Sequence, residues 1–344
     1  MKIRRFSGRP QLAVDLGTAN TVVYRRGHGV VVFEPSIVAI DERSGSVYAV
    51  GAEARRMIGR TPAHISATRP LREGVIADFE MTEHMLRHFI RKAAGGTRLR
   101  ADVMVCVPSG ITQVERNAVT RAARAAGATH AFLIDEPMAA AVGAGLPVAE
   151  PRGAMVVDIG GGTTETAVTA LGSLAVVHSI KVGGYQMDDA IVRSLQQQER
   201  LLIGQEQAEA LKIEIGSATA SADPRGDAEV AGRDLVTGLL RRTSITSAQI
   251  RSALQHPLEQ IVAAVKDVLD RTPAELSADL IEQGITMVGG GALLSGLDTL
   301  LGTRTGLPVT VADTPLLTVA LGAGQALEEI EVLKPRREHR WKLP

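Results

Sequence analysis

The sequence is poor in cysteine, in aromatic residues and in long apolar runs. With a single cysteine in 344 residues, no disulfide can form within the chain, which fits a reducing compartment. Aromatic residues make up 3% of the chain, so its cores must be built from aliphatic side chains. No apolar run approaches the roughly 20 residues of a membrane-spanning helix, and none precedes Asp15. We therefore expect neither a transmembrane helix nor a signal peptide.

The one cysteine, Cys106, lies inside the apolar run Val103 to Val107. Such a run is typical of a buried strand, where cysteine behaves as a small apolar residue. The pattern favours a structural role over a catalytic thiol.

The length suggests two domains, and the charges are unevenly distributed. Domains typically contain roughly 100–200 residues, so 344 residues are too many for a single domain. Residues 1–10 contain four basic residues and no acid, and residues 334–344 contain five basic residues and one acid. Because the formal net charge is +0, the body is acidic. Basic ends indicate either contact with an anionic surface or ordinary solvated tails.

One short motif occurs twice. Asp15-Leu16-Gly17-Thr18 returns in expanded form as Asp158-Ile159-Gly160-Gly161-Gly162-Thr163. Each copy stands between two strand-like runs, so each predicts a tight turn with glycine where the chain bends sharply or admits a ligand. Two such turns facing each other could hold a phosphate chain through backbone N–H groups and threonine hydroxyls. The sequence therefore predicts a nucleotide held between two similar halves.

A second unit is also repeated. The run Val103 to Val107, followed by Pro108-Ser109-Gly110 and a helix, has its counterpart in Ile285 to Val288 followed by Gly289-Gly290-Gly291. The three glycines are expected to open a helix, whose N-terminus favours anionic groups. Because both units recur in the same order, we predict a duplicated α/β domain with a ligand cleft between its halves.

Other elements are predicted from local signals. Thr112 and Glu115 form a capping-box pattern, which opens a helix that Gly127 can close. Two further helices are expected, at residues 247–254 and 258–270.

Asp15 and Asp158 suggest a metal ion. Bare carboxylates would repel a nucleoside triphosphate, but they become useful when Mg²⁺ and its waters lie between them and the phosphates. We predict that both hold Mg²⁺ largely through water, with the β- and γ-phosphates on amides of residues 17–20 and 160–163. Asp-x-Gly is also common turn chemistry, yet two matched copies favour the ligand site. Neither a phosphate loop with Gly-Lys-Ser/Thr nor a Gly-x-Gly-x-x-Gly fingerprint occurs.

Glu136 and two histidines are further candidates. Glu136 ends a strand beside the predicted cleft, where a carboxylate could orient a water for attack on the γ-phosphate. A negative charge at a helix N-terminus, which the helix dipole favours, explains the position of Glu136 equally well.

His84 and His88 have metal-ligand spacing on a helix, but no third ligand is near, so we interpret them as ordinary helix residues.

Several long strings resemble the MreB/Mbl family, the bacterial actin homologues of rod-shape determination. The resemblance runs in order from about Leu12 to about Glu328. The strings are Asp15 to Thr21, Glu34 to Ser36, Gly74 to Phe79, Val107 to Thr112, Glu136 to Ala141, Asp158 to Glu165 and Gly289 to Leu294.

The resemblance implies an α/β, actin-like ATPase fold. Two RNase-H-like domains with smaller inserted subdomains would surround a nucleotide cleft. Domain I would comprise residues 1–145 plus about 315–344, with subdomain IB at about 31–75. Domain II would comprise residues 146–314, with subdomain IIB at about 183–245.

The resemblance also implies roles for individual residues. ATP and Mg²⁺ would be the cofactors, and Glu136 and Thr163 would handle the attacking water as catalytic residues. Glu209 to Lys212 and Gly289 to Leu293 would flank the adenosine. The implied cofactor-binding residues are Asp15, Gly17, Thr18, Ala19, Asn20, Gly160, Gly161, Gly162, Thr163, Glu209, Ala210, Leu211, Lys212, Gly289, Gly290, Gly291, Ala292 and Leu293.

The implied function is that of a cytoskeletal protein. It would polymerise head to tail with itself into membrane-associated filaments, at the inner face of the cell membrane in the cytoplasm. It would have slow Mg-dependent ATPase activity and organise cell-wall synthesis through membrane proteins, with no nucleic acid partner. The alternative is a small-molecule kinase on the same fold, because fold does not fix function.

Four positions depart from the family pattern. Tyr185 follows Gly183-Gly184 where the family usually has an acid, and Leu240 stands at a usual proline position. Asp135 replaces a usual Glu, and Phe33 replaces a usual Asn. We expect these changes to affect subdomain contacts, filament geometry or hydrolysis rate rather than phosphate contacts.

The membrane-binding elements of the family are weak in this sequence. The loop Gly95 to Arg100 has one large apolar residue between arginines, and the N-terminus offers only Ile3 and Phe6 among basic residues. Attachment would depend on electrostatics, at about 1 kcal/mol per basic residue near an anionic surface. Trp341 in the basic tail could add an interfacial anchor.

Overall fold

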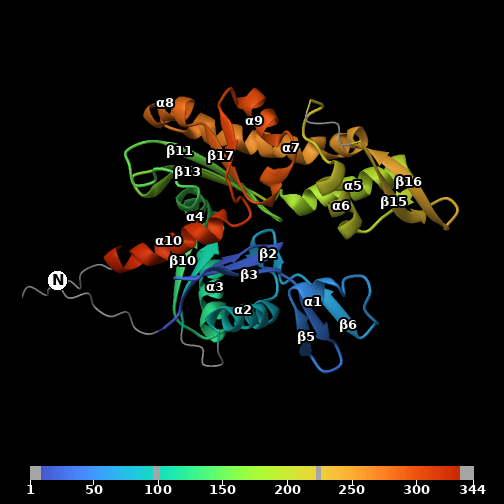
Figure 1. Cartoon of the computed structure of the whole chain (residues 1–344), viewed down its shortest axis with the longest axis horizontal. Helices are drawn as coiled ribbons and strands as arrows, with labels where there is room; N and C mark the ends of the chain where they lie inside the picture. Colours follow the sequence, from blue (N-terminus) through green and yellow to red (C-terminus); the bar gives the residue numbers. More distant parts are fainter. Residues whose placement is uncertain (1–8, 96–100, 222–225, 334–344) are drawn as a thin grey trace, which may run out of the picture.

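The computed structural model describes residues 9–95, 101–221 and 226–333, with side chains as far as residue 328. It consists of two halves, each built on a five-stranded sheet (Figure 1). The segments predicted to contact a membrane, with Ile3, Phe6, Trp341 and residues 96–100, lie outside these ranges. Of the helices within them, none is long and apolar enough to cross a membrane.

The first half is organised around β1 (Gln11–Leu16), whose middle residues are fully buried. On one side β1 pairs antiparallel with β2 (Asn20–Arg25), which pairs antiparallel with β3 (Gly29–Pro35). On the other side it pairs in parallel with β9 (Ala101–Val107), which pairs in parallel with β10 (Ala128–Asp135). The carboxyl ends of the three parallel strands therefore meet at one edge of the sheet, where the turn after β1 begins.

The second half repeats this sheet. β11 (Ala154–Ile159) pairs antiparallel with β12 (Thr164–Ala170), which pairs antiparallel with β13 (Ser173–Ile180). On its other side β11 pairs in parallel with β17 (Ile285–Val288), followed by β18 (Val309–Val311). Strand order and direction match those of the first sheet, which confirms the predicted duplicated α/β architecture.

Each half also carries a smaller inserted sheet, and both lie at the same end of the molecule (Figure 1). In the first half the order is β5-β4-β6, and in the second half it is β14-β15-β16. A two-stranded ribbon, β7 with β8, follows the first inserted sheet. The bounds of these elements are β4 (Val38–Asp41), β5 (Ser46–Val50), α1 (Ala52–Arg55), β6 (Ile65–Thr68), β7 (Leu71–Arg72), β8 (Val75–Ile76), β14 (Leu201–Leu202), β15 (Asp227–Asp234) and β16 (Leu240–Thr246).

Two small-residue helices, α4 (Glu136–Gly143) and α10 (Thr318–Leu333), lie between the two large sheets (Figure 1). They touch backbone to backbone. A Cβ on Gly143 would lie 1.9 Å from a carbonyl oxygen of α10, and one on Gly322 would lie 1.9 Å from a carbonyl oxygen of α4. Only glycine fits at this crossing, so the helices hold the sheets close together.

The apolar layer around α4 and α10 joins the two halves. It contains side chains from the first sheet, such as Met104 and Cys106, and from the second, such as Val156. Cys106 is buried, in agreement with the prediction of a structural strand residue.

The other helices pack against the sheets or against one another. In the first half α2 packs on α3 and on β2, and its Met85 and Phe89 are fully buried. In the second half α7 packs on β12 and β13. These helices are α2 (Phe79–Ala94), α3 (Gln113–Ala125), α5 (Gly184–Gln198), α6 (Gln205–Ile215), α7 (Ser247–Arg271), α8 (Ala274–Gln283) and α9 (Leu297–Thr305).

The predicted capping box at the start of α3 is confirmed. The backbone N–H of Glu115 donates to Thr112 Oγ1 at 3.3 Å, and the backbone N–H of Thr112 donates to Glu115 Oε2 at 2.6 Å. These two backbone N–H groups, which have no partner within the helix, are therefore satisfied by the capping side chains.

Two helix predictions were wrong. The helices expected at 247–254 and 258–270 form one continuous helix, α7, with Pro257 inside it. A proline there removes a hydrogen bond and costs about 3 kcal/mol, but Leu254, Leu258 and Ile261 continue one buried stripe across it and offset that cost. The glycines after β17 open only a short 3₁₀ turn, η1 (Gly290–Leu293), and α9 begins later.

Candidate functional site

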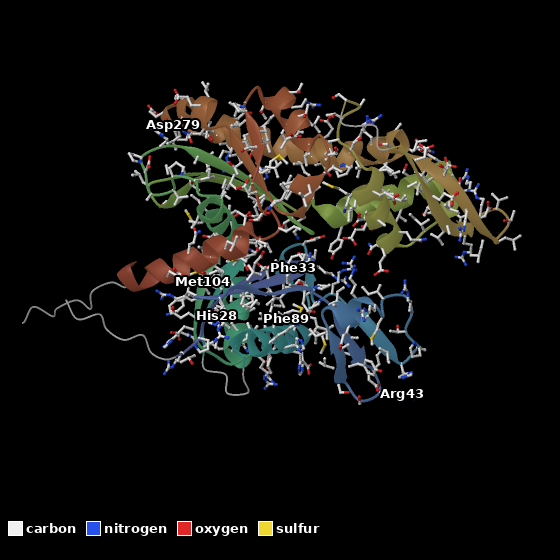
Figure 2. All side chains as sticks on the ribbon, viewed as in Figure 1. His28, Phe33, Arg43, Phe89, Met104 and Asp279 are labelled. Carbon is white, nitrogen blue, oxygen red and sulfur yellow. The ribbon has the colours of Figure 1, made fainter. Side chains whose placement is uncertain are left out.

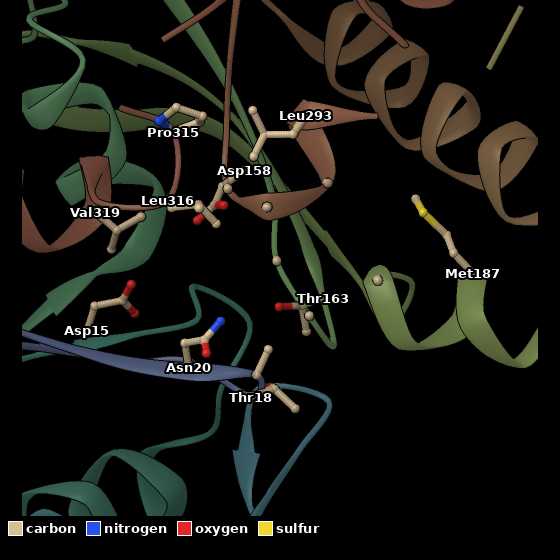
Figure 3. Close-up of a pocket in the computed structure, with 18 of the residues that line it drawn as sticks. Asp15, Thr18, Asn20, Asp158, Thr163, Met187, Leu293, Pro315, Leu316 and Val319 are labelled. Carbon is tan, nitrogen blue, oxygen red and sulfur yellow. The ribbon is translucent and has the colours of Figure 1, made fainter. Parts of the chain in front are cut away.

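Two turns lie at the centre of the molecule. The first turn, residues 17–19, joins β1 to β2, and the second turn, residues 160–163, joins β11 to β12. An aspartate near the end of the preceding strand stands before each turn. Figure 3 shows that Asp15 and Asp158 point from opposite halves into the space between the turns.

The two turns are in direct contact. A Cβ on Gly161 would lie 2.6 Å from the Cβ of Ala19, and a Cβ on Gly162 would lie 2.8 Å from Thr18 Oγ1. A side chain at Gly161 or Gly162 would therefore push the halves apart. The turns therefore face each other, as their sequences predicted, and glycine is needed for the approach.

A cavity of about 340 Å³ opens between the halves beside these turns. This volume falls within the roughly 300–1,000 Å³ of small-molecule sites. The structure brings most of the predicted site residues together in its lining: Asp15, Gly17, Thr18, Ala19, Asn20, Glu136, Asp158, Gly160, Gly161, Thr163, Glu209, Lys212, Gly289, Gly290, Gly291 and Leu293.

Four predicted residues are not part of this lining. Gly162 packs against the first turn instead. Leu211 and Ala292 are buried in the core of the second half, and Ala210 lies on the exposed side of α6.

Much of the apolar lining was not predicted. Phe33, Met187 and Ile213 line the cavity, as do Pro315, Leu316 and Val319 at the start of α10. A helical period would have pointed to Ile213, because Glu209, Lys212 and Ile213 share one face of α6. The cavity thus combines glycine-rich backbone and carboxyls with an apolar wall that suits a flat heterocycle.

The carboxyls of the site are buried, and their pKa values are raised. Burial raises the pKa of Asp15 to about 7. Burial, with added repulsion from Asp15 and Glu165, raises the pKa of Asp158 to about 8. Burial and then the charge of Asp15 also raise the pKa of Glu136 well above its usual range. Ionising all of these groups near pH 7 therefore requires positive charge in the cavity.

The residues present fit a hydrated divalent cation. No ion pair joins Asp15 or Asp158 to a basic side chain in the described parts of the chain. Nor do three or more His, Cys, Asp or Glu side chains there gather closely enough to hold a metal ion by themselves. A cation at Asp15 and Asp158 would therefore need water or ligand oxygens to complete its coordination.

Backbone contacts tie the second turn to α5. The N–H of Gly184 donates to Gly160 O at 2.9 Å, and the N–H of Tyr185 donates to Gly161 O at 2.8 Å. Lys212 Nζ donates to Gly184 O at 2.9 Å and pairs with Asp188 Oδ1 at 2.7 Å. The position of the second turn is therefore fixed by the N-terminal end of α5 and by Lys212 of α6.

A segment of the first half, residues 69–74, crosses to these same elements, and we name it the strap. Arg69 Nε donates to the hydroxyl of Tyr185 at 3.0 Å, and its guanidinium carbon lies 4.7 Å from the centre of that ring. Glu73 Oε2 pairs with Lys181 Nζ at 2.9 Å. The N–H of Gly74 donates to Thr18 Oγ1 of the first turn at 3.1 Å. The strap thus connects the first turn to the second half.

A further bridge closes the side of the cavity at the inserted sheets. Arg55 Nη2 of α1 pairs with Glu209 Oε2 of α6 at 2.7 Å, and Arg55 Nε lies 4.0 Å from Glu206 Oε1. These side chains are partly exposed, so such a pair contributes about 0–1 kcal/mol.

Comparison with known proteins gives a consistent result. A family model described as MreB/Mbl protein matches residues 9–335. The cell shape-determining protein MreB of Escherichia coli (strain K12) is 50% identical over 327 residues, covering 93% of this chain and 94% of that protein. The cell shape-determining protein Mbl of Bacillus subtilis (strain 168) is 46% identical over 328 residues, covering 95% and 98%.

Solved structures give the same fold. MreB5 of Spiroplasma citri bound to AMPPNP has a TM-score of 0.90 and 36% sequence identity, covering 95% of this chain and 98% of that chain. A MamK double helical filament has a TM-score of 0.80 at 22% identity, covering 94% and 99%, which is a likeness of fold alone. The predicted actin-like fold is confirmed.

Without a bound cation, the folded state should lose stability as pH rises. The ordinary pKa of aspartate is 3.8, whereas Asp15 and Asp158 have folded-state values of about 7 and about 8. Their contribution is complete below about pH 4 and is lost as pH rises through the folded values. We expect the thermal midpoint in EDTA to fall between about pH 4 and about pH 8, and Asp158→Asn to flatten that fall.

The matched control is Asp227→Asn, which changes an exposed aspartate at the start of β15. Its thermal midpoint should change with pH as steeply as that of the wild type. An unchanged slope in Asp158→Asn, measured by differential scanning fluorimetry across the same buffers, would contradict the assignment.

Proposed function

The chain belongs to the MreB/Mbl family and has an actin-like fold, and from this premise we propose that it is an ATP-dependent, filament-forming cytoskeletal protein. It polymerises head to tail at the inner face of the cell membrane and helps determine cell shape by organising wall synthesis. The observation that carries this proposal is the contact of two glycine-bearing turns, with Asp15 and Asp158 beside them. Family membership favours this function over a small-molecule kinase.

Nucleotide binding is supported by similar proteins and by the shape of the cavity. MreB5 of Spiroplasma citri has been solved with AMPPNP and with ADP. In this chain the backbone of the two turns is open to the cavity, and Ile213 and Leu293 offer apolar surface to a base. A nucleoside triphosphate joins an anionic chain to such a base, and the AMPPNP and ADP of the MreB5 structures favour ATP.

The chemistry follows from which side chains face the cavity. Mg²⁺ held by Asp15 and Asp158 through water would neutralise phosphate charge and favour the ionised carboxylates. Glu136 begins α4 beside these groups, where its carboxylate can orient an attacking water. Thr163 lies in the second turn with its hydroxyl toward the cavity (Figure 3).

We propose that the chain divides as the resemblance implies. Domain I takes residues 1–145 plus about 315–344, because α10 returns to pack on β1, β2 and β9. Domain II takes residues 146–314. The inserted sheets lie within the subdomains at about 31–75 and about 183–245.

Polymerisation is the direct test. Purified protein with Mg-ATP should sediment as polymer in high-speed centrifugation, with anionic vesicles present and across a range of salts. Protein with ATP and excess EDTA should stay in the supernatant, because Mg²⁺ is needed at the carboxyls. Absence of polymer under every Mg-ATP condition would remove the proposed function.

Substitution of Glu136 tests the hydrolysis step. Glu136→Gln should slow phosphate release by about 10²- to 10⁴-fold, the usual contribution of a general base. ATP affinity should stay near wild type, because the residue orients water rather than nucleotide. Glu229→Gln, an exposed glutamate on β15, should release phosphate at the wild-type rate. Wild-type turnover in Glu136→Gln would remove the assignment.

The strap tests how closure retains nucleotide. Tyr185→Ala removes both the hydrogen bond and the ring under Arg69, whereas Tyr185→Phe removes the bond alone. The hydrogen bond contributes about 0.5–1.5 kcal/mol and the ring contact about 0.5–1 kcal/mol. We therefore expect Tyr185→Ala to release a fluorescent ATP analogue roughly five- to seventyfold faster. Tyr185→Phe should fall in between, in stopped-flow measurements.

The control for loss of an aromatic ring is Tyr48→Ala, which removes an exposed tyrosine on β5. This variant should release the analogue at the wild-type rate. If Tyr185→Ala behaves like Tyr48→Ala, the strap does not retain nucleotide.

A further inference from the structure

Glu165 is a buried carboxyl to which the proposed function gives no role. It lies on β12 with 1% of its surface exposed, and it is not among the residues that line the cavity. Within the described ranges of the chain it forms no ion pair with a basic side chain. Burying a carboxylate is costly unless hydrogen bonds compensate it, so the partners of Glu165 indicate what it contributes.

The hydrogen-bond donors to Glu165 come from both halves of the molecule. From the first half, Ser109 donates twice to Glu165 Oε2, through its backbone N–H at 3.2 Å and through its hydroxyl. From the second half, the hydroxyl of Ser179 donates to Glu165 Oε1. A carboxylate can accept all three bonds. One side chain of the second half therefore holds both the backbone and the side chain of Ser109, and we call Ser109 and Glu165 the latch.

The first-half side of the latch is connected to Glu136. Ser109 lies two residues after the end of β9, the strand on which Met104 packs into the apolar layer between the halves (Figure 2). The last residue of β9, Val107, pairs with Asp135 at the end of β10, and Glu136 comes next. A short stretch of paired backbone therefore connects Ser109 to the carboxyl that is proposed to orient the attacking water.

The second-half side of the latch is connected to Thr163. Glu165 stands two positions after Thr163, near the start of β12. In the sheet Glu165 pairs with Asp158 of β11 on one side and with Ser179 of β13 on the other. Because both of its neighbours are strand residues, the backbone of Glu165 is fixed relative to the second turn.

The two halves pack closely around the latch. A Cβ on Gly110 would lie 3.5 Å from the Cβ of Ser179. A Cβ on Gly74 of the strap would lie 2.8 Å from Pro108 Cγ and 3.1 Å from Thr163 Cγ2. The turn after β9 therefore contacts the second half directly, in a poorly solvated region where hydrogen bonds are stronger than in water.

We propose that the latch holds Glu136 of one half and Thr163 of the other at the separation that orients water for attack on the γ-phosphate. Ser109 and Glu165 are thus positioning residues for ATP hydrolysis, because neither lines the cavity and both act through other groups. This inference rests on the proposed function, since it assigns a role within the hydrolysis step. A carboxyl buried for stability alone would behave differently, because loss of either serine hydroxyl would then affect hydrolysis equally.

Two serine variants separate these cases. Ser109→Ala removes a hydroxyl donor that crosses between the halves, whereas Ser179→Ala removes one that lies within the second half. In single-turnover measurements with Mg-ATP, Ser109→Ala should release phosphate roughly 10- to 100-fold more slowly than the wild type, because small misplacements of reacting groups are costly. Ser179→Ala should slow release by no more than about threefold. Both should bind a fluorescent ATP analogue with near wild-type affinity, which also shows that they are folded.

Two further variants test whether the hydroxyl and the carboxyl act together. Ser109→Thr keeps a hydroxyl at this position and should recover most of the rate that Ser109→Ala loses. Glu165→Leu removes the acceptor, and adding Ser109→Ala to it should slow phosphate release by less than about threefold further, because the shared bond is already absent. Fully additive losses would show that Ser109 does not act through Glu165 and would overturn the latch.

The wild-type protein decides how a negative result is interpreted. If the wild type releases phosphate while Ser109→Ala and Ser179→Ala do so at equal rates, the latch is overturned and the proposed function stands. A loss of ATP affinity in Ser109→Ala as large as its loss of rate would also overturn the latch, because the residue would then hold nucleotide rather than position the attack. If the wild type releases no phosphate, this inference fails, and sedimentation with Mg-ATP shows whether the proposed function fails with it.

Discussion

The contact between the two turns is the constraint on which the rest of the structure depends. Because Gly161 and Gly162 have no side chains, the backbone of the second half approaches Ala19 and Thr18 of the first. That approach brings Asp15 and Asp158 into one shared, poorly solvated space and raises the pKa of both. The cleft is therefore unfavourable for its own carboxylates at neutral pH, and a positive charge placed between them would relieve the repulsion.

The halves are held together in two physically different ways. On one side α4 and α10 cross with no side chain between their backbones at Gly143 and Gly322, inside a dry apolar layer. On the other side the halves meet through polar contacts of the strap and of Arg55, which are partly exposed. The first contact is permanent, because separating it would expose buried apolar surface. The polar contacts of the strap and of Arg55 are individually weak and readily broken.

The sequence predicted the parts of the site that depend on local pattern. The two Asp-Gly turns, their strands and the position of Glu136 follow from short motifs and apolar runs. Most of the apolar wall could not be predicted, because Phe33, Met187 and Pro315 come from distant segments that meet only in the folded chain. The pairing of Arg69 with Tyr185, across 116 positions, has no local signal either. Pro257 misled the helix prediction, because burial across α7 outweighs its backbone preference.

The crossing of α4 and α10 has a mechanical consequence. Because the two helices touch through glycine with no side chain between them, their crossing would act as the hinge if one half rotated against the other. The inserted sheets lie far out from it, at one end of the molecule (Figure 1). A rotation of a few degrees about this crossing would therefore displace the outer strands much farther than the residues beside it. In the filament proposed above, the chemical state of the cleft would then alter how successive subunits are oriented.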